Sequence, residues 1–407
     1  PLVDADKLTK VRARAVIVAT GAFEQPAVFR NNDRPGVMLA SAAQRLLYRH
    51  AIQPGTRAVV LTANADGYRA ALDLHAHGVT VAAVVDLRPG VAPSALAQRL
   101  SRHGVELLAG HAVVEAIGST RVKGVRVAPL DAQGEPTGRA VTHGCDVLLM
   151  SVGWAPAAAL LYQAGARMRY DERVHQFVPD VLPPGVYACG RVNGVFAFAS
   201  RLADGERAGK AAARHLGLAT DPLPEVPAEP DAPSHPWPVV AHPRHKNFVD
   251  FDEDLQLKDF FDAAQEGFDN IELLKRYTTV GMGPSQGKHS NMNAVRILAR
   301  ILGKPIGEVG TTTARPFFHP VPMSHLAGRA FHAERVTPLH DRHAARGAQW
   351  MTAGVWQRPE FYAVAGRTRV EAVRDEALAV RQGVGLIDVG TLGKIEVHGV
   401  QAAELLE

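Results

Sequence analysis

The sequence is poor in cysteine and lacks long apolar runs. Its two cysteines, Cys145 and Cys189, lie far apart, and neither belongs to a Cys-x-x-Cys pair. A disulfide framework or a cysteine-ligated zinc is therefore not expected, and a reducing, cytoplasmic location fits. No apolar run reaches about 18 residues, and the first residues show no secretory pattern, so we expect neither a membrane span nor a signal peptide.

The charge balance of the chain is nearly even. The 407 residues include 45 Lys and Arg against 41 Asp and Glu, which leaves a formal net charge of +4. No long run of Lys and Arg is interleaved with aromatic residues, so nucleic-acid binding is not expected. Hydrophobic residues make up 46% of the chain, which is enough for buried cores, and the length suggests two or three domains.

Five histidines gather late in the chain. Their spacing matches neither a His-Glu-x-x-His motif nor a zinc finger. We therefore expect surface or interface residues, and no metal site, at His319, His325, His332, His340 and His343.

Both ends of the sequence look cut. Residues 1–20 lead directly into a strand, and residues 401–407 stop inside a predicted helix. We expect the sequence to be a piece of a longer protein.

A strand that ends in a small-residue turn opens the chain. Residues 11–22 predict an alternating strand and then a buried apolar run that ends in Thr20, Gly21 and Ala22. Such an ending lies against the dinucleotide in two-domain flavoprotein folds, because a bulky residue in the turn would collide with the cofactor. A core strand that ends in an ordinary turn explains the same residues.

The return strand of this domain is predicted at 186–190, before a helix within 194–216. In flavin-binding relatives of this fold, the glycine here is followed by an Asp that binds the ribityl chain, whereas Gly190 is followed by Arg191. A guanidinium can neutralise a pyrophosphate but cannot accept hydrogen bonds from ribityl hydroxyls, which argues against FAD and favours NAD. The first half of the domain would lie before Pro1.

Residues 57–88 predict a strand, a helix and a second strand, the unit that binds dinucleotides in Rossmann folds. Only Gly67 remains of the expected glycine fingerprint, and Asp66 would repel a phosphate at the start of the helix. Asp86 stands where an acid would bind the ribose, although an ordinary solvated Asp at a strand end is the favoured explanation. We interpret this second unit as structurally intact and degenerate for nucleotide.

Two polar loops follow a proline-rich linker at 218–245. Helices are predicted at 259–275 and 290–302, and the loop between them, 276–288, carries three glycines, two threonines, Gln286 and Lys288. A glycine-bearing loop that enters a helix lets backbone amides approach an anion. The loop at 310–316 adds three threonines and Arg315. Each loop alone is ordinary turn chemistry; together they favour a phosphate or carboxylate site.

The last stretch begins a further domain. Residues 382–399 predict a helix end, a buried strand and a second strand.

Five stretches resemble the alpha subunits of heterotetrameric sarcosine oxidases. They are NNDRPGVMLASA at 31–42, VVLTANADGYRAALDL at 59–74, FVDFDEDLQLKD at 248–259, RYTTVGMGPSQGK at 276–288 and TTTARPF at 311–317. The terminal GVGLIDVGTLGKIEVHG resembles the start of an aminomethyltransferase-like folate-binding domain.

The resemblance implies an α/β fold in several parts. It begins with a Rossmann-type region of two dinucleotide-binding domains, as in flavoproteins. A small helical domain and the start of the folate-binding domain follow. The expected bounds are a partial first domain at 1–50 and 155–217, an inserted second domain at 51–154, the linker at 218–245, the helical domain at 246–325 and the folate domain at 326–407.

The resemblance also implies a function. Family members oxidatively demethylate sarcosine to glycine with formation of hydrogen peroxide, and tetrahydrofolate accepts the one-carbon unit. The alpha subunit binds NAD, FMN lies at the alpha–beta interface, and FAD lies in the beta subunit. The partners are the beta, gamma and delta subunits. The substrate pocket belongs to a partner, so we assign no catalytic residue here and expect the isolated chain to be inactive.

Site residues follow from the motifs. The dinucleotide residues would be Thr20, Gly21, Ala22, Gly190 and Arg191. The alpha side of the FMN site would be formed by Thr278, Thr279, Gln286, Lys288, Thr313 and Arg315.

Two other hypotheses remain. One is a subunit of a related amine, opine or hydroxyproline dehydrogenase, although such relatives often carry a cysteine-rich iron–sulfur segment that this chain lacks. The other is a non-catalytic scaffold or folate-transfer subunit.

Overall fold

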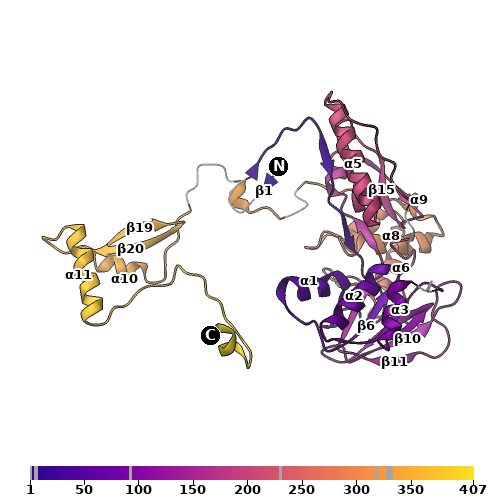
Figure 1. Ribbon diagram of the computed structural model, residues 1–407, viewed down its shortest axis with the longest axis horizontal. Helices are drawn as coiled ribbons and strands as arrows, with labels where there is room; N and C mark the ends of the chain where they lie inside the picture. The colour runs from indigo at the N-terminus through magenta and orange to yellow at the C-terminus, as the bar shows by residue number, and fades with distance from the viewer. Residues whose placement is uncertain (1, 4–7, 91–93, 229–231, 317–319, 327–332) are drawn as a thin grey trace. The chain divides into compact units, whose positions relative to one another are not determined.

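The computed structural model describes residues 2–3, 8–90, 94–228, 232–316, 320–326 and 333–407 (Figure 1). The chain divides into two compact units. One is Arg12–His319, and the other combines Pro1–Val11 with Pro320–Glu407. Within the described residues, no helix has both the length and the apolar character needed to cross a membrane.

The predicted second Rossmann unit is present as a five-stranded parallel sheet in the larger unit. The strand order is β5-β12-β6-β7-β8. The strands are β5 (Val37–Leu39), β12 (Val147–Ser151), β6 (Arg57–Thr62), β7 (Thr80–Asp86) and β8 (Glu106–Ala109).

Both faces of this sheet are covered, which explains its nearly continuous apolar strands. Alternate residues of β6 point to opposite sides: Ala58 and Val60 pack under helices, whereas Val59 and Leu61 pack under a second sheet. The helices are α1 (Ala40–His50), α2 (Ala65–Ala76) and α3 (Ala95–Arg102) (Figure 1). The antiparallel sheet consists of β9 (His111–Ile117), β10 (Gly124–Pro129) and β11 (Val141–Gly144).

The strands that flank this insertion pair with each other. β3 (Val16–Val18) pairs in parallel with β16 (Val186–Ala188), and α5 (Phe198–His215) packs against both. β4 (Ala22–Glu24) pairs in antiparallel fashion with β13 (Trp154–Pro156), so the chain leaves and re-enters the first domain side by side. The predicted buried run at the first strand is wrong at Val16 and Ile17, which are 46% and 43% exposed, because β3 has one paired neighbour and one covering helix.

A helical region follows the linker. It contains a short antiparallel pair, β17 (Phe248–Asp250) and β18 (Leu255–Gln256), before four helices. The helices are α6 (Leu257–Gln265), α7 (Ile271–Thr278), α8 (Asn291–Leu302) and α9 (Ile306–Val309). Phe260, Leu274 and Leu298 form part of its core.

The single helix predicted at 259–275 is wrong, because the chain breaks between α6 and α7. Gly267 has a φ of +96°, in the left-handed region that a right-handed helix cannot contain. Asn270 then accepts a hydrogen bond from the backbone N–H of Glu272, which caps the start of a new helix. The helix predicted at 290–302 is confirmed as α8.

In the smaller unit, β1 (Leu2–Val3) pairs with β2 (Leu8–Thr9), and β19 (Ala348–Ala353) forms a hairpin with β20 (Trp356–Tyr362). Its helices are the 3₁₀-helix η2 (Met323–His325), α10 (His340–Ala345), α11 (Arg369–Gln382) and α12 (Ala402–Leu406). The two strands predicted within 382–399 are wrong: these residues form no strand, and Leu386 and Ile395 are 103% and 90% exposed. A strand forms only where another backbone pairs with it, and no described segment does so here.

The histidine prediction is only partly correct. The half-buried His343 has its Nε2 3.1 Å from Asp388 Oδ2 and its Nδ1 2.7 Å from the hydroxyl oxygen of Tyr362. The ring of His340 stacks on Trp350. Two of the five histidines, His319 and His332, lie outside the described residues. In the part of the chain that the structure describes, His, Cys, Asp and Glu form no group of three that could hold a metal ion.

Candidate functional site

A cavity of about 550 Å³ lies in the larger unit, between the helical region and the chain that follows β13. Phe23 of β4 and residues 155–162 form one side, and α8 with the loops at 281–288 and 311–316 forms the other. A second cavity of about 510 Å³ is partly lined by the same residues, which are Lys275, Gly281, Gln286, Thr313 and Arg315.

Two of the glycines explain why the loop at 276–288 lies so close to α8. Gly281 and Gly287 have φ values of +72° and +70°, which favour glycine. A Cβ at either position would also overlap the side chain of Asn291. Larger residues would therefore both strain the loop and push it away from the helix.

Two carboxylates hold this loop from the other side. The backbone N–H of Gly281 donates to Asp250 Oδ2 at 2.9 Å, and that of Ser285 donates to Asp252 Oδ2 at 2.7 Å. A Cβ on Gly283 would overlap the side chain of Asp252. The expectation that the loop offers its amides to an anion is therefore wrong for these two groups, which the protein's own carboxylates already occupy.

Four of the six residues predicted from the loops line the larger cavity. They come from two loops that are more than twenty residues apart in sequence and are Gln286, Lys288, Thr313 and Arg315.

The other two predicted residues do not line either described cavity. Thr278 is the last residue of α7, and its hydroxyl donates to the backbone oxygen of Leu274 at 2.8 Å. Thr279 adopts a left-handed conformation as the C-cap of α7, and its hydroxyl donates to Glu253 at 3.0 Å.

Both loops are tied to the Rossmann-type region. Gln25 Nε2 donates to the backbone oxygen of Lys288 at 2.8 Å, and Gln163 Nε2 donates to that of Arg315 at 2.9 Å. Gln163 ends α4 (Ala159–Gln163). Tyr162 of the same helix is hydrogen-bonded by Thr311, while burial raises the pKa of its hydroxyl. The cavity walls are therefore connected by specific polar contacts.

The charge of the cavity is positive. Lys275, Lys288 and Arg315 line it, and no Asp or Glu is among its described lining residues. Lys288 Nζ lies 5.9 Å from the ring centre of Phe23. Threonine hydroxyls lie beside these cations, and Phe23, Phe177 and Val295 add apolar surface. This combination suits a ligand with an anionic end and a flat apolar part.

The predicted dinucleotide residues follow the paired strands β3 and β16. Gly21 and Gly190 have φ values of +79° and +74°, and open space surrounds the position of a Cβ at both. The hydroxyl of Thr20 donates to the backbone oxygen of Ala157 at 2.7 Å. A ligand can therefore approach the backbone closely at both strand ends.

Arg191, also predicted to bind the dinucleotide, lies against Trp154 and Asp66. Its guanidinium carbon lies 4.2 Å from the ring centre of Trp154, and its Nη2 lies 3.7 Å from Asp66 at the start of α2. Burial lowers the pKa of Arg191, and the negative charge of the nearby Asp66 partly opposes this decrease. The structure thus brings Arg191 to the second Rossmann unit.

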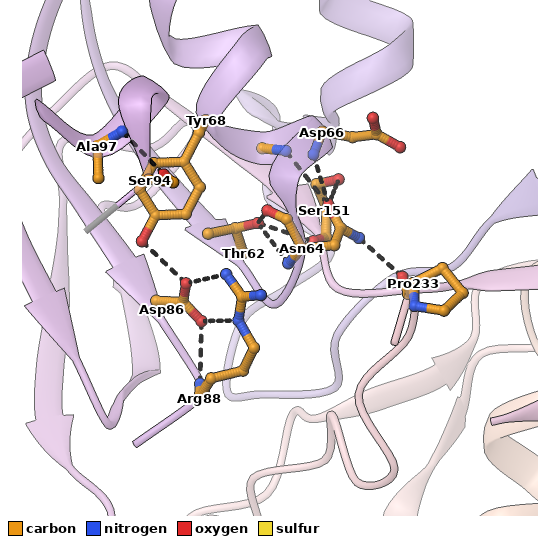
Figure 2. Close-up of polar contacts among 11 residues, drawn as sticks. Thr62, Asn64, Asp66, Tyr68, Asp86, Arg88, Ser94, Ala97, Ser151 and Pro233 are labelled. Carbon is orange, nitrogen blue, oxygen red and sulfur yellow. Dashed lines mark hydrogen bonds and ion pairs between the residues drawn. The ribbon is translucent and has the colours of Figure 1, made fainter. Parts of the chain in front are cut away.

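Asp86 is neither solvated nor open to a ribose. Its side chain is fully buried, and its two oxygens accept hydrogen bonds from the hydroxyl of Tyr68 and from the backbone and guanidinium of Arg88 (Figure 2). Four donors on one carboxylate leave no room for ribose hydroxyls.

Lys275, Asp250 and Asp252 are site residues that the sequence analysis missed. Lys275 stands at the end of the single helix predicted at 259–275. Because that helix is in fact broken, the sequence did not show which way the Lys275 side chain points. The two aspartates alternate with apolar residues in the stretch 248–252, a period of two that places both on one side of the chain. That alternation was a usable signal.

Comparison with known proteins gives three family matches. Residues 2–212 match the pyridine nucleotide-disulphide oxidoreductase family, residues 244–329 match the sarcosine oxidase A3 domain, and residues 339–407 match the GCVT N-terminal domain. In the solved L-proline dehydrogenase of P. horikoshii, a similar fold covers 80% of this chain and 61% of that chain, with a TM-score of 0.59 and 22% identity.

Curated relatives are similar along nearly the whole chain. The sarcosine oxidase subunit alpha of Rhizobium meliloti is 36% identical over 98% of this chain and 40% of its own length. That of Corynebacterium sp. (strain P-1) is 37% identical over 99% of this chain and 43% of its own length. The chain thus spans about two fifths of these relatives. The resemblance of its motifs to sarcosine oxidase alpha subunits is confirmed, and the chain belongs to the pyridine nucleotide-disulphide oxidoreductase family.

Proposed function

We propose that this chain is part of the alpha subunit of a multisubunit flavin oxidase that demethylates sarcosine oxidatively. The reaction gives glycine and hydrogen peroxide, and the one-carbon unit passes to tetrahydrofolate. The support is the identity of 36–37% to curated sarcosine oxidase alpha subunits, together with the matches to the sarcosine oxidase A3 domain and the GCVT N-terminal domain. The amine would bind in a partner subunit.

The cavity between the two loops is the observation that carries this proposal. We infer that it holds FMN at an interface with the beta subunit. The volume of about 550 Å³, the cations Lys275, Lys288 and Arg315 and the apolar wall suit the phosphate and the ring of such a cofactor. When bound, FMN would supply electron transfer to oxygen. A cation at the pyrimidine edge of its ring would stabilise the reduced, anionic flavin.

The first domain would bind NAD. Thr20, Gly21, Ala22 and Gly190 would contact it, because open space surrounds the Cβ positions of the two glycines, although the N–H of Gly190 already donates to Asp204. Arg191 would act only indirectly, since its guanidinium already contacts Trp154 and Asp66.

The remaining assignments concern the assembly. FAD would lie in the beta subunit, and gamma and delta subunits would complete the complex. Residues 339–407 match the start of a folate-type domain, which supports tetrahydrofolate as the acceptor. We place the assembly in the cytoplasm, and we expect the chain alone to show no oxygen uptake with sarcosine.

Replacement of the cavity cations tests the flavin assignment. The native assembly would be purified through a tag on this chain, and its FMN content measured by absorbance after acid release. Each lost charge-assisted contact costs about 1.5–3 kcal/mol, so Lys288→Ala and Arg315→Ala should weaken FMN retention by about tenfold or more.

Matched controls are available on the same chain. Lys304 and Arg102 are exposed and line neither cavity, so Lys304→Ala and Arg102→Ala should retain wild-type FMN. An unchanged FMN content in both Lys288→Ala and Arg315→Ala would refute the assignment of this cavity.

A further inference from the structure

The carboxyl edge of the five-stranded sheet is where an open α/β sheet binds its ligand. The strand order reverses at β6, with β12 and β5 on one side and β7 and β8 on the other. A crevice opens at such a point beyond the strand ends, and dinucleotides bind across it in Rossmann units. In this protein, the crevice lies beyond Thr62 of β6 and Ser151 of β12.

The chain's own segment 232–240 runs across this edge. Asn64 Nδ2 donates to the backbone oxygen of Pro233 at 3.0 Å, a contact that Figure 2 shows reaching from the start of α2. The backbone N–H of His235 donates to Val152 at 2.9 Å, and that of Trp154 donates to Ser234 Oγ at 2.9 Å. Ser234 is only 2% exposed. This part of the predicted linker is therefore packed rather than exposed.

Gly153 makes the close approach possible. Its φ lies outside the left-handed region, so its backbone would accept an alanine. A Cβ there would nevertheless lie 2.9 Å from the Cβ and 3.2 Å from the Cα of Ser234. The absence of a side chain at Gly153 thus serves the segment 232–240.

The groups that would bind a pyrophosphate are also in use. Asn64 Oδ1 accepts the backbone N–H groups of Asp66 and Gly67 at 3.0 and 3.3 Å, which caps α2 (Figure 2). Asp66 adds a carboxylate at the same helix start, paired with Arg69 at 2.6 Å and with Arg191 at 3.7 Å. Protein groups therefore occupy both positions: Asn64 and Asp66 take the place of the phosphate, and the fully bonded Asp86 is closed to the ribose.

We propose that residues 232–235 are the resident ligand of this crevice. The second Rossmann unit binds a segment of its own chain where a dinucleotide would otherwise lie. The segment then continues beside Val28, whose N–H donates to the backbone oxygen of Pro238 at 2.9 Å and whose backbone oxygen accepts from the N–H of Val240 at 2.7 Å. The crevice therefore anchors the connection that leads to the cavity loops, and this role is independent of the proposed NAD and FMN sites.

Hydrogen exchange of the full chain tests the occupancy directly. Exchange would be followed by mass spectrometry with and without millimolar NAD⁺, NADH and NADPH, each in turn. We expect that no nucleotide slows exchange in peptides that cover residues 60–68 and 84–90, and that none speeds exchange in residues 232–240. Protection confined to 18–24 and 188–194 agrees with this inference, because it reports the first domain. Protection of 60–68 or 84–90 overturns it.

A glycine pair tests the packing of the segment. Gly153→Ala should push Ser234 away and speed exchange across 232–240 on the order of tenfold, since local opening then costs less. Gly144→Ala is the matched control, because no atom lies within 4 Å of a Cβ there. Should Gly153→Ala fail to fold, Ser234→Ala removes the acceptor for Trp154 and should also speed exchange. Wild-type rates in the folded variant contradict the proposal.

Discussion

At the scale of single residues, Asp250 and Asp252 hold the loop that lines the cavity. Their carboxylates accept the N–H groups of Gly281 and Ser285, so the loop's amides face the protein while Gln286 and Lys288 face the cavity. The aspartates therefore hold the loop in place, and we propose that its cavity-lining side chains contact a ligand. Asp250 is buried and Asp252 is exposed, and as charged acceptors both form stronger hydrogen bonds to backbone N–H groups than a neutral acceptor would.

Gly283→Ala should disrupt this arrangement. The added Cβ overlaps Asp252, so the loop must move and the bond from Ser285 is lost. We expect a loss of about 1–3 kcal/mol in the free energy of unfolding, together with lower FMN retention in the assembly. Urea denaturation measures the first. Gly209→Ala is the control: it lies within α5 with open space around it, and it should be neutral or stabilising.

Residue types could be predicted from the sequence, but side-chain directions could not. Gln286, Lys288, Thr313 and Arg315 line the cavity as the polar loops suggested. Thr278 does not, because a threonine within a helix can bond back to the carbonyl one turn earlier, and here it does. The choice between these outcomes depends on where α7 ends, which the residue pattern does not fix.

At the scale of elements, Asp171 holds the turn between β14 (Arg167–Asp171) and β15 (Gln176–Val181). It accepts hydrogen bonds from the backbone and the guanidinium of Arg173. These contacts, with Arg173 the largest cause, lower the pKa of Asp171 from 3.8 to about 2. The hairpin carries Phe177 into the wall of the cavity.

The pH dependence of this hairpin follows from that shift. A carboxylate with a lowered folded-state pKa stabilises the fold fully above about pH 4, and this contribution is lost as the pH falls toward 2. Asp171→Asn should therefore remove part of the stability at pH 5 and flatten its decline between pH 4 and 2. Chemical denaturation at a series of pH values measures both effects. An identical pH profile for wild type and variant would contradict the assignment.

Elements with a long regular pattern were predicted well, and their interruptions were not. The strand at 57–62 and the helix at 290–302 were predicted to within one residue of the observed bounds of β6 and α8. The break between α6 and α7 was missed because a left-handed glycine at 267 and a cap at Asn270 interrupt an otherwise helical pattern. The strands expected within 382–399 depend on a pairing partner, which no local pattern supplies.

At the scale of the whole molecule, the two Rossmann-type parts have different roles. In the first, open space surrounds the Cβ positions of Gly21 and Gly190, where we propose that a cofactor binds. The second fills its own crevice with Pro233 and Ser234 and bonds Asp86 internally. The degenerate fingerprint was visible in the sequence, whereas its occupant was not, because that segment lies about 170 residues further along the chain.

We propose that this chain forms one side of a flavin site in a larger oxidase. The most direct measurement is the absorbance and native mass spectrum of the assembly purified through this chain from its own cell. We expect partner subunits together with FMN, FAD and NAD in the same complex. A single polypeptide that carries no flavin would contradict it.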